Sequence, residues 1–486
     1  MKKYKLIIAL TCIILANFSC NEDALDLSDP NKLSPETFFK TVPQVQSAVN
    51  AAYVDLESIQ LFTRNMFFMM DNLAQENLGN EALDPNFAQF IDYSFDSSSG
   101  QVKGYWDSCF RGINKANFVI GNEDAINEIA DAVLSPENKA KFVGEAKFMR
   151  AYYYFMLVTR FGDIPLFPGI IEDGDGRPRS PKEEIYELII SDLQSASTSL
   201  LTKASEQVGR ATKGAAISLL GKVYLYQQNY SAALAEFNKV SGLGYSLDPV
   251  FENNFLEATE HGVESIFEIE FNDEERSRHS WRSDASGTAF ASFRGKEYGW
   301  KDWFNVYPSD DLLDEFEAGD PRYAITFYTT GDSYIGGTVE IPQERRAGWR
   351  KYQNYTVHSG EDTSSGINFN AIRYADVLLM MAECANEVSS QSEAAGYVNE
   401  VRARAGVPAI STGLTKSEMF DAIIHERKVE LAGEQIRFAD IIRWGNASTE
   451  LSGSNFVSGK HELFPIPDAE MSSNENINSA DQNPGY

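Results

Sequence analysis

The sequence is poor in the residues that most often carry catalysis or bind metals, because only 4 of its 486 residues are cysteine and only 5 are histidine. The histidines are scattered and lack the spacing of a metal-ligand motif; they are His261, His279, His358, His425 and His461. The signatures His-Glu-x-x-His, Gly-x-Ser-x-Gly, Walker A and the dinucleotide fingerprint are absent from the sequence. The sequence therefore gives no indication of an enzyme, a metal site or a cofactor.

Basic residues are also scarce relative to acidic ones. The chain has 42 lysines and arginines against 71 aspartates and glutamates, which gives a formal net charge of -29. This balance argues against a nucleic-acid partner, because phosphate backbones are bound by basic surfaces. The hydrophobic share of 43% and the aromatic share of 12% indicate a globular chain rather than a disordered one.

The apolar run at the N-terminus is too short for a transmembrane helix. Residues 6–16 (LIIALTCIILA) carry no charge and follow a basic stretch, whereas a helix that spans a bilayer needs about 20 apolar residues. The pattern is typical of a secretory signal peptide, which we place at residues 1–19. Ser19-Cys20 resembles the cleavage site of bacterial lipoproteins, so Cys20 is predicted to carry the lipid. The alternative is an ordinary secreted protein in which Cys20 has no such role.

The four cysteines do not form a disulfide framework. Cys12 leaves with the signal peptide and Cys20 is assigned to the lipid, so only Cys109 and Cys384 remain. Each of these two lies in a helical pattern. We predict small buried side chains there, not a disulfide bridge or a nucleophile.

Several segments begin with helix-start signals. Ser-Pro pairs are followed by acidic residues at Ser34, Ser135 and Ser180, where serine is the expected N-cap, and Glu183 has the spacing of a capping box. Thr415 and Glu418 repeat the capping-box spacing. Residues 142–161 place apolar side chains at intervals of three and four, which predicts an amphipathic helix that ends at Gly162.

A tetratricopeptide signature lies in the middle of the chain. Leu220-Gly221-x-x-Tyr224 is followed by Ala233-x-x-x-Phe237, and both identity and spacing match the repeat. The small residues Gly221 and Ala233 allow two antiparallel helices to approach, and the larger ones fill the seam. One such repeat cannot bury its own apolar face, so we expect others. The candidates are 142–161 with 184–200, and 371–388 with 391–405.

The helical period fades between residues 246 and 368. Glycine, serine, aspartate and aromatic residues dominate this stretch, with a short extended piece at 265–271. It holds four of the six tryptophans, namely Trp281, Trp300, Trp303 and Trp349. Long irregular segments in compact proteins are usually functional or disordered, and the aromatic content argues against disorder.

Charged residues near the C-terminus have the spacing of structural ion pairs. Glu426, Arg427 and Glu430, and then Arg437, Asp440 and Arg443, recur at helical i,i+3 and i,i+4 intervals. A catalytic carboxylate pair is the alternative, but it needs two carboxylates that face one cleft. We therefore expect intrahelical and interhelical ion pairs.

Six stretches of the chain together resemble the SusD/RagB family of Bacteroidetes. They are GEAKFMRAYYYFMLVTRFGDIPL, GRATKGAAISLLGKVYL, INFNAIRYADVLLMMAECAN, VNEVRARAGVP, IIHERKVELAGEQIRFADIIRWG and LFPIPDAEMSSNENINSADQNPGY. They occur in the family's order, from the lipoprotein signal to Tyr486. Asn21-Glu22-Asp23, directly after Cys20, is similar to the export signal of surface lipoproteins in these bacteria.

The resemblance implies an all-α-dominated fold of tetratricopeptide-like helix pairs in a single domain, residues 20–486. The helical scaffold would comprise 35–245 and 370–450, with a loop-rich insertion at 246–368 that carries much of the ligand site and a C-terminal wrap at 451–486. It also implies a lipid-anchored protein on the outer-membrane surface. Such a protein captures a glycan or oligosaccharide and delivers it to a SusC-like TonB-dependent transporter, without catalysis and without a cofactor.

Exposed aromatic rings are the natural platforms for such a ligand, because sugar rings present C–H faces that stack on Trp and Tyr. The candidates are Trp281, Tyr298, Trp300, Trp303, Trp349 and Tyr352. The alternative for each is a ring buried against the helices, and it is stronger for Trp300 and Trp303, which precede a helix-like segment. Trp281 has polar and small neighbours and is the leading candidate. The resemblance adds Asn72 and Asn77 as partners for hydroxyl groups.

Two other functions stay open at this point. A peptide-capturing RagB-like member would keep the same scaffold and transporter but line its site for backbone hydrogen bonds. A tetratricopeptide adaptor that binds another protein is a different class, and the signal peptide and the long insertion count against it.

Overall fold

The computed structural model describes residues 38–171, 174, 176–272, 291–342, 344–361 and 365–486. Most of this part of the chain is helical, and the strands are short. Among these residues no helix is both long enough and apolar enough to cross a membrane. Cys20, Trp281 and the Ser34-Pro35 pair lie outside the described residues.

The first helical series runs through the N-terminal half of the chain. It comprises α3 (Val42–Val54), α4 (Asn65–Leu73), α5 (Pro85–Ile91), α6 (Gly100–Ile120), α7 (Glu123–Asn127), α8 (Pro136–Phe161), α9 (Lys182–Ser199), α10 (Lys213–Tyr226) and α11 (Tyr230–Val240). Neighbours in sequence pack on each other, as α8 does with α9 and α10 with α11. The second series packs onto α11 through α15. It contains α15 (Tyr374–Val388), α16 (Gln391–Ala405), α17 (Lys416–Glu430), α18 (Arg437–Trp444), α19 (Ala447–Glu450) and α20 (Asp468–Ser473).

The predicted tetratricopeptide pair is confirmed in α10 and α11. Gly221 faces the Phe237 ring so closely that a Cβ atom at this position would lie 2.5 Å from Phe237 Cε1. Ala233 is fully buried in the same contact. The two further pairs also form, α8 with α9 and α15 with α16, although α15 begins only at Tyr374 because residues 369–373 form strand β10. The mainly helical, tetratricopeptide-like prediction is therefore confirmed.

Three of the predicted helix starts can be compared with the structure. The Ser135 hydroxyl accepts from the Asn138 backbone N–H, and Thr415 and Glu418 form a full capping box. The predicted cap at Ser180 is wrong, because Ser180 belongs to strand β3 and α9 begins after Pro181. The Lys182 N–H donates instead to Asp163 Oδ1, at 2.9 Å.

Short antiparallel ribbons connect the helices. They pair β1 (Asn77–Gly79) with β5 (Val306–Pro308), β2 (Ile164–Pro165) with β3 (Arg179–Ser180), and β4 (Ser265–Ile269) with β10 (Phe369–Arg373). Two smaller ribbons pair β6 (Phe327–Tyr328) with β9 (Gly348–Trp349) and β7 (Ser333–Tyr334) with β8 (Gly337–Thr338). The extended piece predicted at 265–271 thus corresponds to β4.

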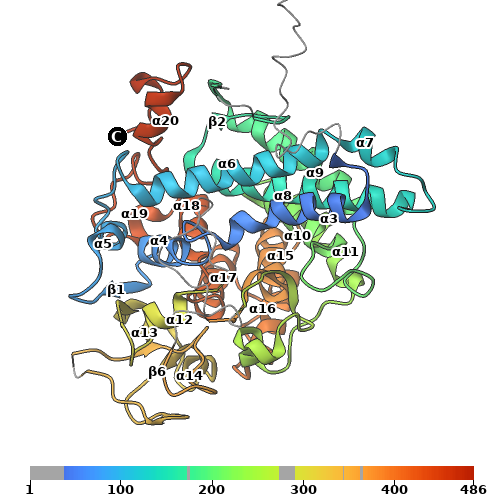
Figure 1. Ribbon diagram of the computed structural model, residues 1–486. Helices are drawn as coiled ribbons and strands as arrows, with labels where there is room; N and C mark the ends of the chain where they lie inside the picture. The colour runs from blue at the N-terminus through green and yellow to red at the C-terminus, as the bar shows by residue number, and fades with distance from the viewer. Residues whose placement is uncertain (1–37, 172–173, 175, 273–290, 343, 362–364) are drawn as a thin grey trace, which may run out of the picture.

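The irregular half has a hydrophobic cluster of its own. Its short helices α12 (Arg294–Tyr298), α13 (Asp310–Glu315) and α14 (Arg322–Thr326) gather at one end of the molecule beside β1 and α4 (Figure 1). Phe67 and Phe68 of α4 pack there with Tyr298 and Trp349, apart from the main core between the helices. Cys109 and Cys384 are buried free thiols in the main core, as predicted.

Candidate functional site

Four residues predicted to contact a ligand form one buried polar network. Asn72, Asn77, Tyr298 and Trp349 are all fully buried. Trp349 Nε1 donates to Asn77 Oδ1 at 2.8 Å, and Asn77 Nδ2 donates to the Tyr298 hydroxyl at 2.8 Å and to Asn72 Oδ1 at 3.0 Å. The polar atoms of the four residues bind one another. The rings of Tyr298 and Trp349 pack in the hydrophobic cluster of the irregular half. The structure thus brings these residues together, but as core residues and not as exposed ligand contacts.

Tyr352 is also internal. Only 3% of its surface is exposed, and its ring packs against Phe255 and Phe369. The Arg294 guanidinium lies between the two tyrosines, 4.6 Å from the Tyr298 ring centroid and 5.1 Å from that of Tyr352. Tyr352 is therefore a second correction to the predicted platform, since its faces are used in packing.

Two buried carboxylates, those of Asp71 and Glu76, lie next to this network. Arg294 Nη2 donates to Asp71 Oδ2 at 3.2 Å, and the Gly433 N–H donates to Glu76. Burial raises the pKa of Asp71. Burial, together with the neighbouring charge of Asp71, raises the pKa of Glu76 to about 8. Two carboxylates with raised pKa values are therefore buried beside the start of β1.

Trp300 is half-buried and acts as a supporting ring. It meets Tyr334 edge to face with 5.5 Å between ring centroids, and it contacts Tyr355 at 5.8 Å. Asp302 holds this group in place, because it accepts from the Tyr355 hydroxyl at 2.6 Å and from Lys296 Nζ at 2.8 Å. Trp300 is therefore a partly buried ring that packs against the tyrosines of this group.

Trp303 is the predicted aromatic residue with the most exposed side chain among those described. It is 38% exposed, although its position before a helix favoured burial. It precedes β5 by three residues, and in that strand Tyr307 stands opposite Leu78 of β1, which is 37% exposed. Asn80 donates through Nδ2 to the Phe304 carbonyl at 2.9 Å, which fixes β1 to the chain directly after Trp303.

We define the β1–β5 surface as Leu78, Asn80, Trp303, Tyr307 and Arg345. The Arg345 guanidinium lies 4.0 Å from the centre of the Tyr307 ring. The surface thus combines flat aromatic faces with an amide and a guanidinium. This is the chemistry that saccharide recognition needs, since ring faces stack on aromatic groups and hydroxyls bind amide or guanidinium groups at the rim.

Of these five residues, the sequence predicts only Trp303 as a ligand contact. Leu78 and Tyr307 are more than 200 positions apart, and the two strands that join them have three residues each. No periodic pattern can be recognised in strands so short. The Arg345 contact with Tyr307 likewise depends on tertiary structure alone.

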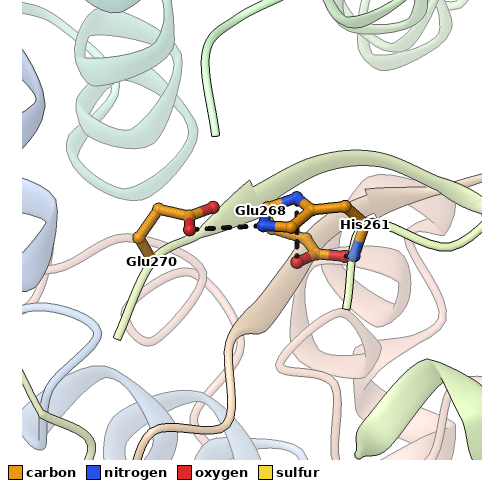
Figure 2. A group of neighbouring side chains, drawn as sticks. All are labelled: His261, Glu268 and Glu270. Atoms are coloured by element: carbon orange, nitrogen blue, oxygen red, sulfur yellow. Dashed lines mark hydrogen bonds and ion pairs between the residues drawn. The ribbon is translucent and has the colours of Figure 1, made fainter. Parts of the chain in front are cut away.

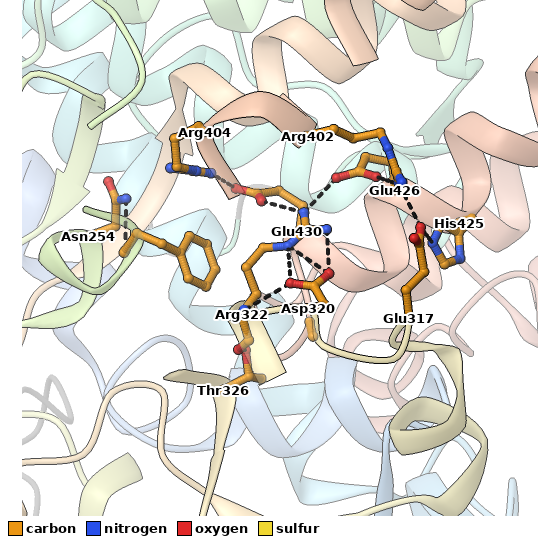
Figure 3. A network of polar contacts seen from close by, with 12 residues as sticks. Asn254, Glu317, Asp320, Arg322, Thr326, Arg402, Arg404, His425, Glu426 and Glu430 are labelled. Carbon is orange, nitrogen blue, oxygen red and sulfur yellow. Dashed lines mark hydrogen bonds and ion pairs between the residues drawn. The ribbon is translucent and has the colours of Figure 1, made fainter. Parts of the chain in front are cut away.

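A buried ion-pair network holds the irregular half against the helices (Figure 3). Arg322 of α14 binds Asp320 at 2.7 Å, and it reaches Glu426 and Glu430 of α17 at 2.5 and 2.9 Å. Burial alone would raise the pKa of Glu430, but the charges of Arg404, Arg373 and Arg322 outweigh it and hold this pKa well below its usual range.

This network confirms the structural interpretation of the charged motifs. Arg402 of α16 binds Glu426 at 2.9 Å, so both α17 glutamates are ion-paired between elements. In the second set, Arg443 pairs with Asp440 at the predicted i,i+3 spacing, while Arg427 reaches Asp440 from α17. The carboxylates are thus neutralised by arginines, which does not favour a general acid and base.

His261, Glu268 and Glu270 form a compact group that sequence spacing did not indicate (Figure 2). One imidazole nitrogen, Nδ1, lies 3.4 Å from Glu268 Oε2, and Nε2 lies 3.3 Å from Glu270 Oε2. One ligand atom from each residue lies within 4.8 Å of the others, a separation at which the three could hold a metal ion. As it stands, the imidazole bridges two carboxylates.

Further carboxylates surround this group. Burial raises the pKa of Glu57 to about 8, and Glu270 adds to the shift. Burial also raises the pKa of Glu260 to about 8, with Glu268 and Glu270 contributing. Burial alone would lower the pKa of His261, but the hydrogen bond to Glu270 and the nearby carboxylates outweigh it and raise this pKa. Glu57, Glu260 and His261 therefore release their protons at a higher pH than the same groups do in water.

Comparison with known proteins identifies the family. A family model described as the SusD family matches residues 263–462, and another, described as starch-binding and associating with the outer membrane, matches residues 23–225. SusD-like protein P2 of Formosa agariphila is 31% identical over an alignment that covers the whole of both chains. The chain belongs to the SusD family.

Solved structures of SusD-family proteins share the fold. A SusD superfamily protein of Bacteroides vulgatus aligns with a TM-score of 0.81 at 24% identity, over 93% of this chain and 100% of that one. A laminarin-binding SusD-like protein aligns with a TM-score of 0.79 at 25% identity, over 92% and 100%. The helix pairs and the irregular half are therefore features of SusD-like architecture.

The two matched spans meet at the β1–β5 surface. Leu78 and Asn80 lie in the span described as starch-binding, while Trp303, Tyr307 and Arg345 lie in the span described as the SusD family. The surface is consequently assembled from both parts of this SusD-family chain.

Proposed function

We propose that this SusD-family protein captures a glycan at the bacterial cell surface through the β1–β5 surface and passes it to a SusC-like TonB-dependent transporter. The observation that carries the proposal is Trp303, which is 38% exposed and leads into β5. In the same ribbon, Tyr307 lies opposite Leu78 and under the Arg345 guanidinium, and Asn80 donates to the Phe304 carbonyl. The laminarin-binding relative and the starch-binding family description support a saccharide as the ligand.

The geometry suits a saccharide for a physical reason. Sugar hydroxyls exchange water for protein hydrogen bonds at a net gain of only about 0.5 to 1.5 kcal/mol each. Stacking on an aromatic face must therefore supply much of the affinity. Trp303, with 38% of its surface exposed, is the proposed ring, and the Asn80 amide and the Arg345 guanidinium are the proposed partners for sugar hydroxyls.

The location follows from the N-terminal signals. A lipid on Cys20 would anchor the protein to the outer membrane, and the acidic residues 21–23 favour display on the outer face. The family description as associating with the outer membrane supports this placement.

A glycan array on the protein without residues 1–20, followed by calorimetric titration, tests the proposal. Trp303→Ala should weaken binding of the selected glycan about 30-fold, equivalent to about 2 kcal/mol, the loss typical of a hot-spot residue. Trp303→Phe retains a ring and should lose much less. Equal affinity in all three proteins would show that the ligand binds elsewhere.

Two further readouts separate the alternatives. Chromatography of the glycan after prolonged incubation should recover it unchanged, because we propose binding without turnover. A peptide library tested in parallel should give no binding. Peptide binding that depends on Trp303, together with an empty glycan array, would favour a peptide-capturing protein instead.

A further inference from the structure

A large cleft opens on the helical half, away from the β1–β5 surface. Its volume is about 810 Å³, and it lies between the C-terminal ends of α8 and α10, the start of α9, helix α18 and the C-terminal segment. Small-molecule sites typically have volumes of about 300 to 1,000 Å³. The cleft shares no residue with the β1–β5 surface, so it needs its own explanation.

Arg160 lies in this cleft with an uncompensated charge. The buried arginines of the described chain are Arg150, Arg160, Arg294, Arg322, Arg373, Arg402, Arg427 and Arg437. All of them except Arg160 have a carboxylate within 3.2 Å. For Arg160, which is only 6% exposed, the described residues provide no carboxylate at ion-pair distance.

The contacts of Arg160 are neutral ones. Its guanidinium lies 5.4 Å from the centre of the Phe438 ring and near the Tyr105 hydroxyl, which itself donates to the Met156 carbonyl at 3.0 Å. A buried charge without a counter-charge is costly. Because Arg160 lines both the cleft and a smaller cavity of about 80 Å³ that shares its wall, an anion that enters the cleft would reach it.

A second guanidinium in the cleft is also without an ion-pair partner among the described residues. Arg179 donates to the Asp163 carbonyl at 2.8 Å, to Asn483 Oδ1 at 2.6 Å and to the Asp481 carbonyl, all of them backbone or amide oxygens. Arg443 is the opposite case, because Glu383 and Asp440 neutralise it. Lys182 also lines the cleft, as do the carboxylates of Asp163 and Glu183. The lining thus has more cationic than anionic side chains, although the whole chain has a net charge of -29.

We propose that this cleft is a second ligand site, which takes a saccharide that carries a carboxylate or sulfate group. Arg160 would bind the anionic group through two parallel N–H donors, the arrangement in which arginine recognises such groups best. Tyr186, Tyr226 and Gln228 also line the cleft, and their hydroxyl and amide groups suit the hydroxyls of a sugar. An acidic protein segment fits less well, since only two guanidiniums lack ion pairs.

Calorimetric titration with trigalacturonate, with maltotriose as the neutral counterpart, tests the site. Trigalacturonate should bind the wild type at least 10-fold more tightly than maltotriose, and Arg160→Met should remove that preference. The matched control is Arg177→Met, which removes the same charge from a nearby arginine that does not line the cleft. Trp303→Ala should leave trigalacturonate binding intact, so this site and the β1–β5 surface can fail separately.

Hydrogen exchange of the wild type tests the same site without a variant, so the proposal can be tested even if Arg160→Met folds poorly. Added trigalacturonate should protect amides in 158–163 and 179–186 from exchange. Absence of trigalacturonate binding, equal binding by Arg160→Met and wild type, or protection confined to 77–80 and 303–308 would overturn the proposal. Tetraglutamate that binds more tightly than trigalacturonate, with the same dependence on Arg160, would assign the cleft to a protein partner and overturn the saccharide assignment.

Discussion

At the scale of single residues, exposure distinguishes aromatic rings that have the same chemistry. Trp349 and Trp303 are both tryptophans of the irregular half, yet Trp349 is fully buried and bonded to Asn77 while Trp303 is 38% exposed. A buried ring stabilises the fold and an exposed ring can meet a ligand. The two residues should therefore respond differently to the same substitution.

Trp349→Ala should lower the free energy of unfolding by about 3 to 5 kcal/mol, the range for truncation of a large buried ring. It also leaves Asn77 Oδ1 without the indole donor. Trp303→Ala should cost much less stability, because its ring already meets water. Urea denaturation of both variants measures the difference, and equal losses would contradict the assignment of Trp303 to an exposed surface.

Cys20 is predicted to anchor the mature protein. Cys20→Ala removes the only sulfur to which the signal would attach a lipid, so the protein should move from the membrane fraction to the soluble fraction. Fractionation of cells that express each form provides the measurement. A variant that stays with the outer membrane would disprove the lipid anchor and favour a simple secreted protein.

At the scale of secondary-structure elements, the close contact of α10 with α11 depends on the absence of a side chain at Gly221. Gly221→Leu should destabilise the protein by about 1 to 3 kcal/mol through overpacking against Phe237. Gly396 of α16 is the matched control, because a Cβ there would meet nothing within 4 Å. Gly396→Ala should stabilise by up to about 1 kcal/mol through better helix propensity. Thermal melts in which both variants behave alike would argue against the close approach.

The sequence predicts those features that depend on nearby residues. The Gly221 and Ala233 spacing and the caps at Ser135 and Thr415 each involve one or two turns of helix, and the structure confirms them. The cap at Ser180 failed because Asp163, from a distant segment, supplies the acceptor for α9.

The site was less predictable for the same reason. Trp349 and Asn77 are 272 positions apart, and their hydrogen bond turns a predicted ligand residue into a core residue. The β1–β5 surface joins Leu78 with Tyr307 across a similar distance. Composition could indicate that aromatic residues gather in the irregular half. Only the tertiary structure decides which faces they expose.

At the scale of the whole molecule, carboxylates with raised pKa values make stability depend on pH. Burial is the largest cause at Glu57, Glu76 and Glu260, whose pKa values rise from about 4.5 to about 8. The folded chain therefore keeps protons that the unfolded chain releases, and stability falls as pH rises through this window. His261, with its pKa also raised, acts in the same direction above its usual value of 6.5.

We predict that the melting temperature falls between pH 5 and pH 9. Glu57→Gln should raise the melting temperature at pH 9 and leave it nearly unchanged at pH 5, where Glu57 of the folded protein is already protonated. Thermal melts across this range supply the measurement. The same gain at both pH values would show that the carboxylate of Glu57 is ionised throughout and that its pKa is not raised.

The central claim, that an exposed surface of a SusD-family scaffold binds a glycan, is tested most directly by hydrogen exchange with and without the glycan that the array selects. We expect slower exchange at 77–80 and 303–308, which contain β1, β5 and the chain that follows Trp303, with little change in α10 and α11. Protection that leaves both of these segments unchanged while the glycan is bound would contradict it.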